Sequence, residues 1–246
     1  MTMSKRVGYL IFALTAVAFI VFAVMMERAG AGASHVKVDV KQSSGYGFVD
    51  IEALKAYVEK NLSKVSPDSV SGRILPIEKH VSRNPYIEKT LVYRQPSGDV
   101  KVELWEEQPS FRIVTDSGNY YVSRVGNIMP VKAGIGVDVP LVYGRAEKGS
   151  FPGVKEVIRR VEQDDFFSTQ AIGIQVSRRF KNGKAVYDYA VDTRSGMKVM
   201  LGMAEDMDVK FENFGIIYAY LYSAGKTDDY KVVNLEFGNY LICQKK

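Results

Sequence analysis

The sequence predicts an α+β protein with three parts: a single N-terminal transmembrane helix, a β-α-α-β-β domain, and a mostly antiparallel β domain that carries two helices. An uncharged apolar stretch near the N-terminus predicts the first part. Short segments of alternating apolar and polar residues predict strands, and segments with apolar residues three or four positions apart predict helices. The expected boundaries are residues 1–6 for a cytoplasmic head, 7–26 for the transmembrane helix, 27–34 for a linker, 35–108 for the first domain and 109–246 for the β domain.

The transmembrane helix is expected from Val7 to Met26. This stretch has no charged residue, no Asn or Gln, and no proline. Its length spans about 30 Å as a helix, which is the thickness of a bilayer's hydrocarbon core. Because Lys5 and Arg6 form a short positive head, we expect the N-terminus in the cytoplasm and the bulk of the chain outside. The alternative is a cleaved signal peptide with small residues at 29–34, although the apolar stretch is longer than usual for one.

The first domain begins with a strand over residues 35–41, where apolar and polar side chains alternate. A helix is expected after Asp50, a suitable N-cap, because apolar residues recur with helical spacing from Ile51 to Leu62. The other elements expected here are a helix at 76–82, strands at 87–94 and 100–104, and a turn with Pro and Gly between those strands.

The second domain is predicted to be richer in strands. Asn182-Gly183 is a favoured two-residue hairpin turn, and it lies between two strand-like segments. Gly225 is suitably placed to end a helix that begins at Met207. The predicted strands are 111–115, 120–123, 127–131, 171–180, 185–191, 197–201, 231–237 and 240–243, and the predicted helices are 152–165 and 207–223.

Composition and charge exclude several function classes. The chain is 46% hydrophobic and 25% charged, which is ordinary for a globular body. Its net charge of +5 is spread along the chain, whereas a nucleic-acid-binding surface would need a clustered basic stripe. Cys243 is the only cysteine, so no intramolecular disulfide forms.

Catalytic and metal-binding motifs are absent from the sequence. His35 and His80 stand in different contexts, and there is no H-E-x-x-H motif, cysteine pair or G-x-S-x-G elbow. The pattern S-x-x-K marks envelope enzymes that acylate a serine. It occurs three times here, as often as chance would give for two common residues, and no K-T-G motif accompanies it. Glu106 and Glu107 have no identifiable second carboxylate across a cleft. We therefore expect no enzymatic activity, no cofactor and no metal.

Short motifs in a fixed order resemble the cell-division family FtsQ/DivIB, whose first soluble module is a POTRA domain. The motifs that carry the resemblance are Asn84-Pro85-Tyr86-Ile87, Arg94-Gln95-Pro96, Glu106-Glu107-Gln108-Pro109, Tyr121-Val122-Ser123-Arg124-Val125-Gly126, Val139-Pro140-Leu141-Val142-Tyr143-Gly144, Met197 to Gly202 and Val233-Asn234-Leu235-Glu236-Phe237.

The resemblance implies a bitopic inner-membrane scaffold at the division septum, with most of the chain in the periplasm. Such proteins bind the small coiled-coil proteins FtsB and FtsL, and they help recruit or regulate septal peptidoglycan synthesis. The alternative is a single-POTRA envelope adaptor in secretion or outer-membrane assembly. Neither reading involves nucleic acid or a small-molecule substrate.

The partner-binding residues are expected at the end of the chain. A last strand at a sheet edge invites strand addition by a partner, and aromatic residues are favoured interface anchors. Phe211, Phe214 and Tyr218 share one stripe of their helix and are expected in the core. The predicted partner-binding residues are Tyr220, Tyr222, Tyr230, Val232, Val233, Asn234, Leu235, Glu236, Phe237, Tyr240 and Ile242.

Overall fold

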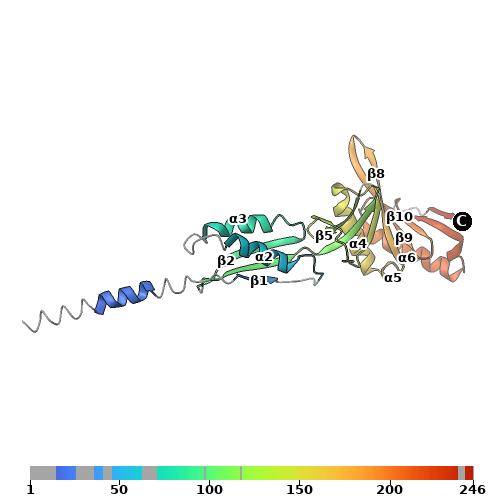
Figure 1. The fold of residues 1–246 in the computed structure, drawn as a ribbon. Coiled ribbons are helices and arrows are strands. Elements are labelled where there is room, and N and C mark those ends of the chain that lie inside the picture. Colours follow the sequence, from blue (N-terminus) through green and yellow to red (C-terminus); the bar gives the residue numbers. More distant parts are fainter. Residues whose placement is uncertain are drawn as a thin grey trace, which may run out of the picture. The chain divides into compact units, whose positions relative to one another are not determined.

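The computed structural model describes residues 15–25, 36–40, 46–62, 71–96, 98–116, 118–237 and 242–245, with the backbone alone at 36–40 and 71. The chain forms two compact units, Met1–Glu106 and Glu107–Lys246 (Figure 1). Both units combine helices with a sheet, so the α+β class is confirmed.

Near the N-terminus, residues 15–25 are helical and large apolar side chains on them are exposed, among them Phe19, Ile20 and Phe22. Within the described ranges, every helix is too short or too polar to cross a bilayer. The rest of the expected span, the head and the linker lie outside the described residues. The transmembrane helix from Val7 to Met26 therefore stays a prediction.

The first unit has the five expected elements in the expected order. They are β1 (Val36–Val40), α2 (Ile51–Leu62), α3 (Ser71–Val81), β2 (Ile87–Arg94) and β3 (Val100–Glu106). The sheet order is β1-β3-β2, with β1 parallel and β2 antiparallel to β3. Asp50 caps α2 as predicted, since its Oδ1 accepts a hydrogen bond from the Ala53 amide at 3.0 Å.

Helix α3 begins five residues before the predicted position. The prediction placed Pro76 at the helix start, where a residue without an N–H is favoured. In the structure Pro76 lies inside the helix on its exposed face, so its missing hydrogen bond is on the solvent side. Ile77 and Val81 fix the helix because both are buried against the sheet in the core of this unit.

The second unit is built on one nine-stranded sheet of order β12-β11-β10-β9-β8-β7-β4-β5-β6. Its strands are β4 (Pro109–Thr115), β5 (Gly118–Ser123), β6 (Ile128–Pro130), β7 (Leu141–Gly144), β8 (Ala171–Lys181), β9 (Lys184–Thr193), β10 (Lys198–Gly202), β11 (Tyr230–Asn234) and β12 (Ile242–Lys245). Its helices are α4 (Phe151–Gln163), α5 (Asp165–Gln170) and α6 (Met207–Ser223), with 3₁₀ turns η2 (Lys148–Ser150) and η3 (Thr227–Asp229).

This sheet is mixed, and most neighbouring pairs of its described strands are antiparallel, as predicted. The pairs β4–β7, β7–β8 and β10–β11 are parallel, and the other neighbouring pairs are antiparallel. The short strand β7 and the short helix α5 were not predicted. Asp164 separates α5 from α4, because its Oδ1 accepts hydrogen bonds from the amides of Phe166 and Phe167.

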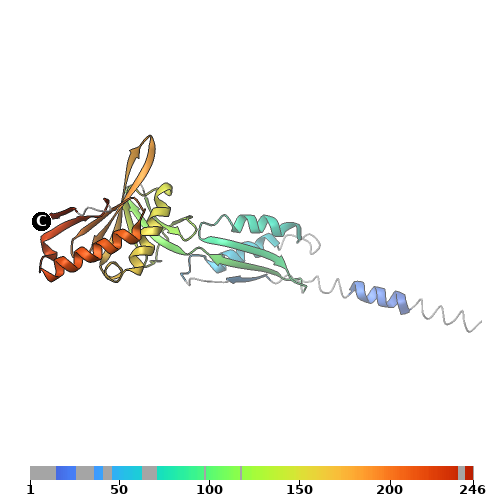
Figure 2. The same cartoon turned by 180° about the vertical axis from the view of Figure 1, so that it is seen from behind.

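Helices α4 and α6 lie across one face of the sheet (Figure 2). Val154, Val157, Ile158 and Val161 of α4 have helical spacing and point into the core, as predicted. The core of this unit continues through strand residues such as Ile113 and through the inner side of α6.

Strands β8 and β9 form a long hairpin that projects from the sheet (Figures 1 and 2). The predicted Asn-Gly turn is confirmed, with φ of 52° at Asn182 and 74° at Gly183. Pairing of β8 with β7 stops at Val176, and pairing of β9 with β10 begins at Tyr189. The end of the hairpin is therefore a two-stranded ribbon, with no third strand among the described residues.

Candidate partner-binding surface

Helix α6 has an inner face that is fixed by aromatic packing. Phe211 and Phe214 are buried, as expected, and each lies within 4.8 Å of the ring centroid of Phe167 on α5. Tyr218 is half-buried, and its ring centroid is 4.3 Å from that of Phe166. These contacts hold α6 in one orientation on the sheet, and they determine which residues face outward.

The outer face of α6 is also apolar. Tyr220 is 66% exposed and Tyr222 is 72% exposed, as predicted for contact residues. Val209 and Ile216 are exposed too, and with Tyr220 they form one stripe at positions i, i+7 and i+11. Neither was predicted from the sequence, although apolar residues on every side of the helix were the available signal.

The C-terminal end of α6 is closed by the predicted glycine. Gly225 has φ of +63°, and its amide donates to the Tyr222 carbonyl at 3.1 Å. The Lys226 amide donates to the Leu221 carbonyl at 2.9 Å, so the two bonds form a Schellman motif. This cap ends the helix directly after the exposed tyrosines and turns the chain toward η3 and β11.

Strand β11 buries alternate side chains. Val233 is buried, and so is Leu235 just beyond the strand, whereas Val232 and Asn234 are half-buried. Val233 and Leu235 were among the predicted partner-binding residues, but the period of two along a strand places their side chains in the core. Their side chains are therefore removed from the candidate surface.

The predicted strand 231–237 ends earlier, at Asn234. The Asn234 Oδ1 accepts a hydrogen bond from the Glu236 amide at 2.8 Å, which turns the chain away from the ladder. Glu236 is half-buried, with an Oε1 3.5 Å from Arg179 Nη2. Phe237 follows it and is exposed, so the turn presents an aromatic side chain next to an ion pair.

Strand β12 lies at one end of the nine-stranded order and pairs with β11 alone among the described strands. Ile242 on it is 55% exposed, and Cys243 is half-buried, where burial raises the pKa of its thiol. Lys245 was not predicted, and its Nζ lies 5.9 Å from the centroid of the half-buried Tyr230 ring. The predicted contact residue Tyr240 lies outside the described residues.

A cavity of about 470 Å³ lies beside this surface, and its lining includes Phe237 and Val209. Lys210 on its wall is buried, and its Nζ donates to the Met203 carbonyl at 2.8 Å. Burial lowers the pKa of Lys210, while nearby carboxylates, including those of Asp206 and Glu236, oppose that shift. The cavity walls carry both signs of charge, which suits a peptide segment better than a single anion.

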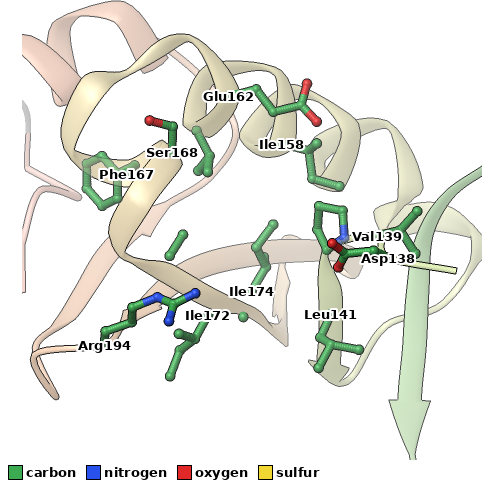
Figure 3. Close-up of a pocket in the computed structure, with 14 residues that line it drawn as sticks. Asp138, Val139, Leu141, Ile158, Glu162, Phe167, Ser168, Ile172, Ile174 and Arg194 are labelled. Atoms are coloured by element: carbon green, nitrogen blue, oxygen red, sulfur yellow. The ribbon is translucent and has the colours of Figure 1, made fainter.

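A second cavity, of about 530 Å³, lies between α4, α5 and the start of β8 (Figure 3). Ile158, Ile172 and Ile174 line it, with Arg194 and Asp138 well apart from each other in the view. Its Ser168 Oγ donates to the Asp165 carbonyl, and no histidine or cysteine belongs to the lining. Within the described ranges, no group of three or more His, Cys, Asp and Glu residues is placed to hold a metal ion.

The candidate surface therefore consists of β12, the exposed residues of β11 and the following turn, and the outer face of α6. It offers backbone hydrogen-bonding groups at a sheet edge and aromatic side chains nearby, which suits protein binding rather than catalysis.

Comparison with known proteins agrees with this description. The family model described as FtsQ/DivIB, C-terminal related, matches residues 108–244, which include the candidate surface except Lys245. No curated protein matches the chain. Because the matched region is more than half of the sequence, the chain belongs to the FtsQ/DivIB family.

Proposed function

We propose that the protein is a bitopic inner-membrane scaffold of cell division. Its β12 edge and the outer face of α6 bind small coiled-coil proteins of the FtsB and FtsL kind, and the complex helps recruit or regulate septal peptidoglycan synthesis. Membership of the FtsQ/DivIB family supports a role in cell division and in divisome protein interactions.

The observation that carries this proposal is the position of β12. A strand that is paired on one side presents unsatisfied N–H and C=O groups on the other, and an extended segment of a partner can satisfy them. Ile242 and Phe237 stand exposed next to that edge, where they provide side-chain contacts for such a segment. Tyr220 and Tyr222 on α6 extend the apolar surface to a helix, which suits a partner with both a strand and a helix.

The rest of the chain supports the same proposal. The first unit has the element order and the β1-β3-β2 sheet of a POTRA-like module, for which we propose a role in reaching the septum. The exposed apolar residues of the 15–25 helix suit a membrane-embedded segment, with the N-terminus in the cytoplasm and the main body in the periplasm.

The proposal is tested by capture of the tagged full-length chain from a membrane extract, with bound proteins identified by mass spectrometry. We expect the wild type to retain small coiled-coil division proteins. The double variant Tyr222→Asp/Phe237→Asp should lose them, because charges replace two exposed aromatic contacts. Val125→Asp is the matched control, since Val125 is equally exposed but lies in the turn before β6.

Two results would contradict the proposal: a wild type that captures no coiled-coil division protein, or a Val125→Asp control that loses capture as fully as the double variant. A fluorescent fusion distinguishes the alternative. Midcell signal agrees with a division scaffold, whereas uniform envelope signal favours an adaptor in secretion or outer-membrane assembly.

A further inference from the structure

We propose that the projecting end of the β8–β9 hairpin binds the anionic lipid surface of the membrane to which the chain is tethered. This inference rests on the proposed function in one respect, the N-terminal membrane tether. It concerns residues that adjoin the partner-binding surface, because Arg179 pairs with Glu236 and Lys181 lines the cavity that Val209 and Phe237 also line. Its residues are Ser177–Tyr187, called here the hairpin tip.

The hairpin tip extends beyond the rest of its sheet. In register, Ser177 pairs with Asp188 and Lys181 pairs with Lys184, so the ribbon continues for five residues on each strand past the last contact with β7. Figures 1 and 2 both show it standing clear of the sheet. A two-stranded ribbon is only marginally stable by itself, and no third strand supports this one among the described residues.

The base of the ribbon is held by ion pairs. Glu147 of the loop before η2 accepts hydrogen bonds from Arg178 at 2.9 Å and from the Tyr187 hydroxyl at 2.7 Å. On the other face, Arg179 pairs with Asp188 of the opposite strand. These contacts fix the direction of the ribbon, and they use the charges of both arginines.

The sequence of the far end has cations and an aromatic ring and no carboxylate, while Lys181 also lines the cavity that Glu205 and Asp206 of another segment line. From Val176 to Tyr187 there is no Asp or Glu. Lys181 and Lys184 flank the turn, both are exposed, and neither forms an ion pair with a described residue. Phe180 is 68% exposed, and the Arg178 guanidinium lies 5.4 Å from its ring centroid.

This combination fits a lipid surface better than an acidic protein segment. A flat bilayer is reached only by convex protrusions, and the tip is such a protrusion, whereas a protein segment would need a groove or a strand edge with pockets for its side chains. An aromatic ring at the headgroup level, with lysines beside it that extend toward the phosphates, is the arrangement that membrane interfaces favour.

The tip has few contacts, so its binding is weak when the protein is free in solution. Two lysines and one phenylalanine give only a modest attraction to anionic lipid. A chain that is already tethered to the same membrane needs no stronger attraction, because the tether keeps the tip at a high effective concentration near the lipid. The tip would then restrict how the second unit moves above the lipid.

The test uses full-length protein reconstituted in vesicles of phosphatidylcholine alone or mixed with phosphatidylglycerol. Cys243→Ser removes the native thiol, and Ala185→Cys places a polarity-sensitive fluorophore opposite Phe180 in the ribbon. In vesicles that contain phosphatidylglycerol, we expect the fluorophore's emission to shift to the blue and to be quenched by brominated lipid. In vesicles of phosphatidylcholine alone, we expect neither change. Lys181→Gln/Lys184→Gln should weaken the contact about fivefold per lysine, and added salt should weaken it further.

Matched controls separate this site from a general charge effect. Lys79→Gln/Lys148→Gln removes two other exposed lysines and should leave the signal unchanged. Phe180→Ala should reduce quenching, whereas Leu75→Ala, at another exposed apolar residue, should not. Thermal unfolding confirms that each variant stays folded.

Two results with lipid alone would overturn the proposal. One is a fluorophore that reports water equally in both lipid compositions, and the other is an equal loss of signal in the control lysine variant. A blue shift that appears only when division proteins are added would assign the tip to a protein partner and would likewise overturn it. No partner is needed for the lipid measurement, so failure here leaves the proposal for β12 and α6 intact.

Discussion

The two edge strands of the nine-stranded sheet differ in how readily each could pair with an added strand. At one end, β6 is three residues long and finishes at Pro130, which has no N–H to donate. At the other end, β12 is four residues long, contains no proline, exposes Ile242 and ends at Lys245. Short length, lysine and proline all hinder strand addition, and proline alone among them removes a backbone donor. One end is therefore protected and the other remains available.

The loops near each end reinforce this difference. In the loop after β6, the Val137 amide donates a hydrogen bond to the hydroxyl of the buried Tyr121 at 3.2 Å. This bond holds the loop against β5. At the β12 end, the chain enters β11 from α6, whose outer face is apolar and exposed. We therefore propose that a partner binds at the edge beside the exposed apolar face of α6, and not at the proline-terminated edge.

The largest effect is expected from a charge in the strand that supports the available edge. Val233→Asp should destabilise the second unit by about 4 kcal/mol or more, because it leaves a carboxylate unpaired in the core. Lys231→Asp, on the exposed part of the same strand, should change stability by less than about 0.5 kcal/mol. Urea-dependent pulse proteolysis measures both. Similar losses would mean that the Val233 side chain is not in the core as described.

The comparison of the edges is tested most directly by one matched pair of substitutions. Ile242→Asp on β12 should weaken partner capture about thirtyfold, whereas Ile128→Asp on β6 should leave capture unchanged. Both isoleucines are exposed edge-strand residues, so the two variants should have similar stability. Titration of captured partner against tagged full-length protein gives the ratio. If Ile128→Asp weakened capture as much as Ile242→Asp, the edges would not differ in function.

A smaller effect is expected where the chain leaves β10. Gly202 has φ of +66°, and a Cβ there would lie 2.7 Å from Glu236 Cγ. Gly202→Ala should therefore be less stable than Gly196→Ala, which has φ of +79° but open space around it. The backbone conformation alone costs about 1–2 kcal/mol in each case. Equal unfolding free energies for the two variants would show that the contact with Glu236 is unimportant.

The smallest effect concerns the pH dependence of stability near Lys210. Its folded-state pKa lies below the ordinary value of 10.5 because burial disfavours the charged form. The unfolded chain therefore binds more protons just below pH 10.5, and stability should rise as pH increases through that range. Lys210→Met removes this group, so the difference in unfolding free energy between wild type and variant should change as the pH rises toward 10.5. A difference that does not vary with pH would contradict the lowered pKa.

Local signals predicted much of this fold. The Met207–Ser223 helix, its glycine cap, the Asp50 N-cap and the Asn182-Gly183 turn each depend on residues that are close in sequence, and each was predicted correctly. The parallel pairing of β10 with β11 could not be predicted in this way. It joins segments that are separated by a whole helix, and nothing in either segment specifies its neighbour.

The candidate surface was predicted less completely than the fold. Tyr220 and Tyr222 lie off the stripe of Phe211, Phe214 and Tyr218, and this position correctly indicated that they are exposed. Ile216 was missed because only aromatic residues were considered as contact residues on this helix. Val233 and Leu235 were predicted as partner-binding residues because the two faces of the strand were not distinguished. The hairpin tip was predicted as a hairpin, yet its projection depends on where β7 and β10 stop.

The connection of β10 to β11 through α6 has a mechanical consequence. Because these two strands are parallel, α6 is the crossover that carries the chain from the end of one to the start of the other. A partner that holds both the outer face of α6 and the β12 edge encloses β11 between two anchored elements. Tension on the partner is then shared by the whole β10–β11 ladder, and the β11 amides should exchange hydrogen with solvent more slowly in the complex.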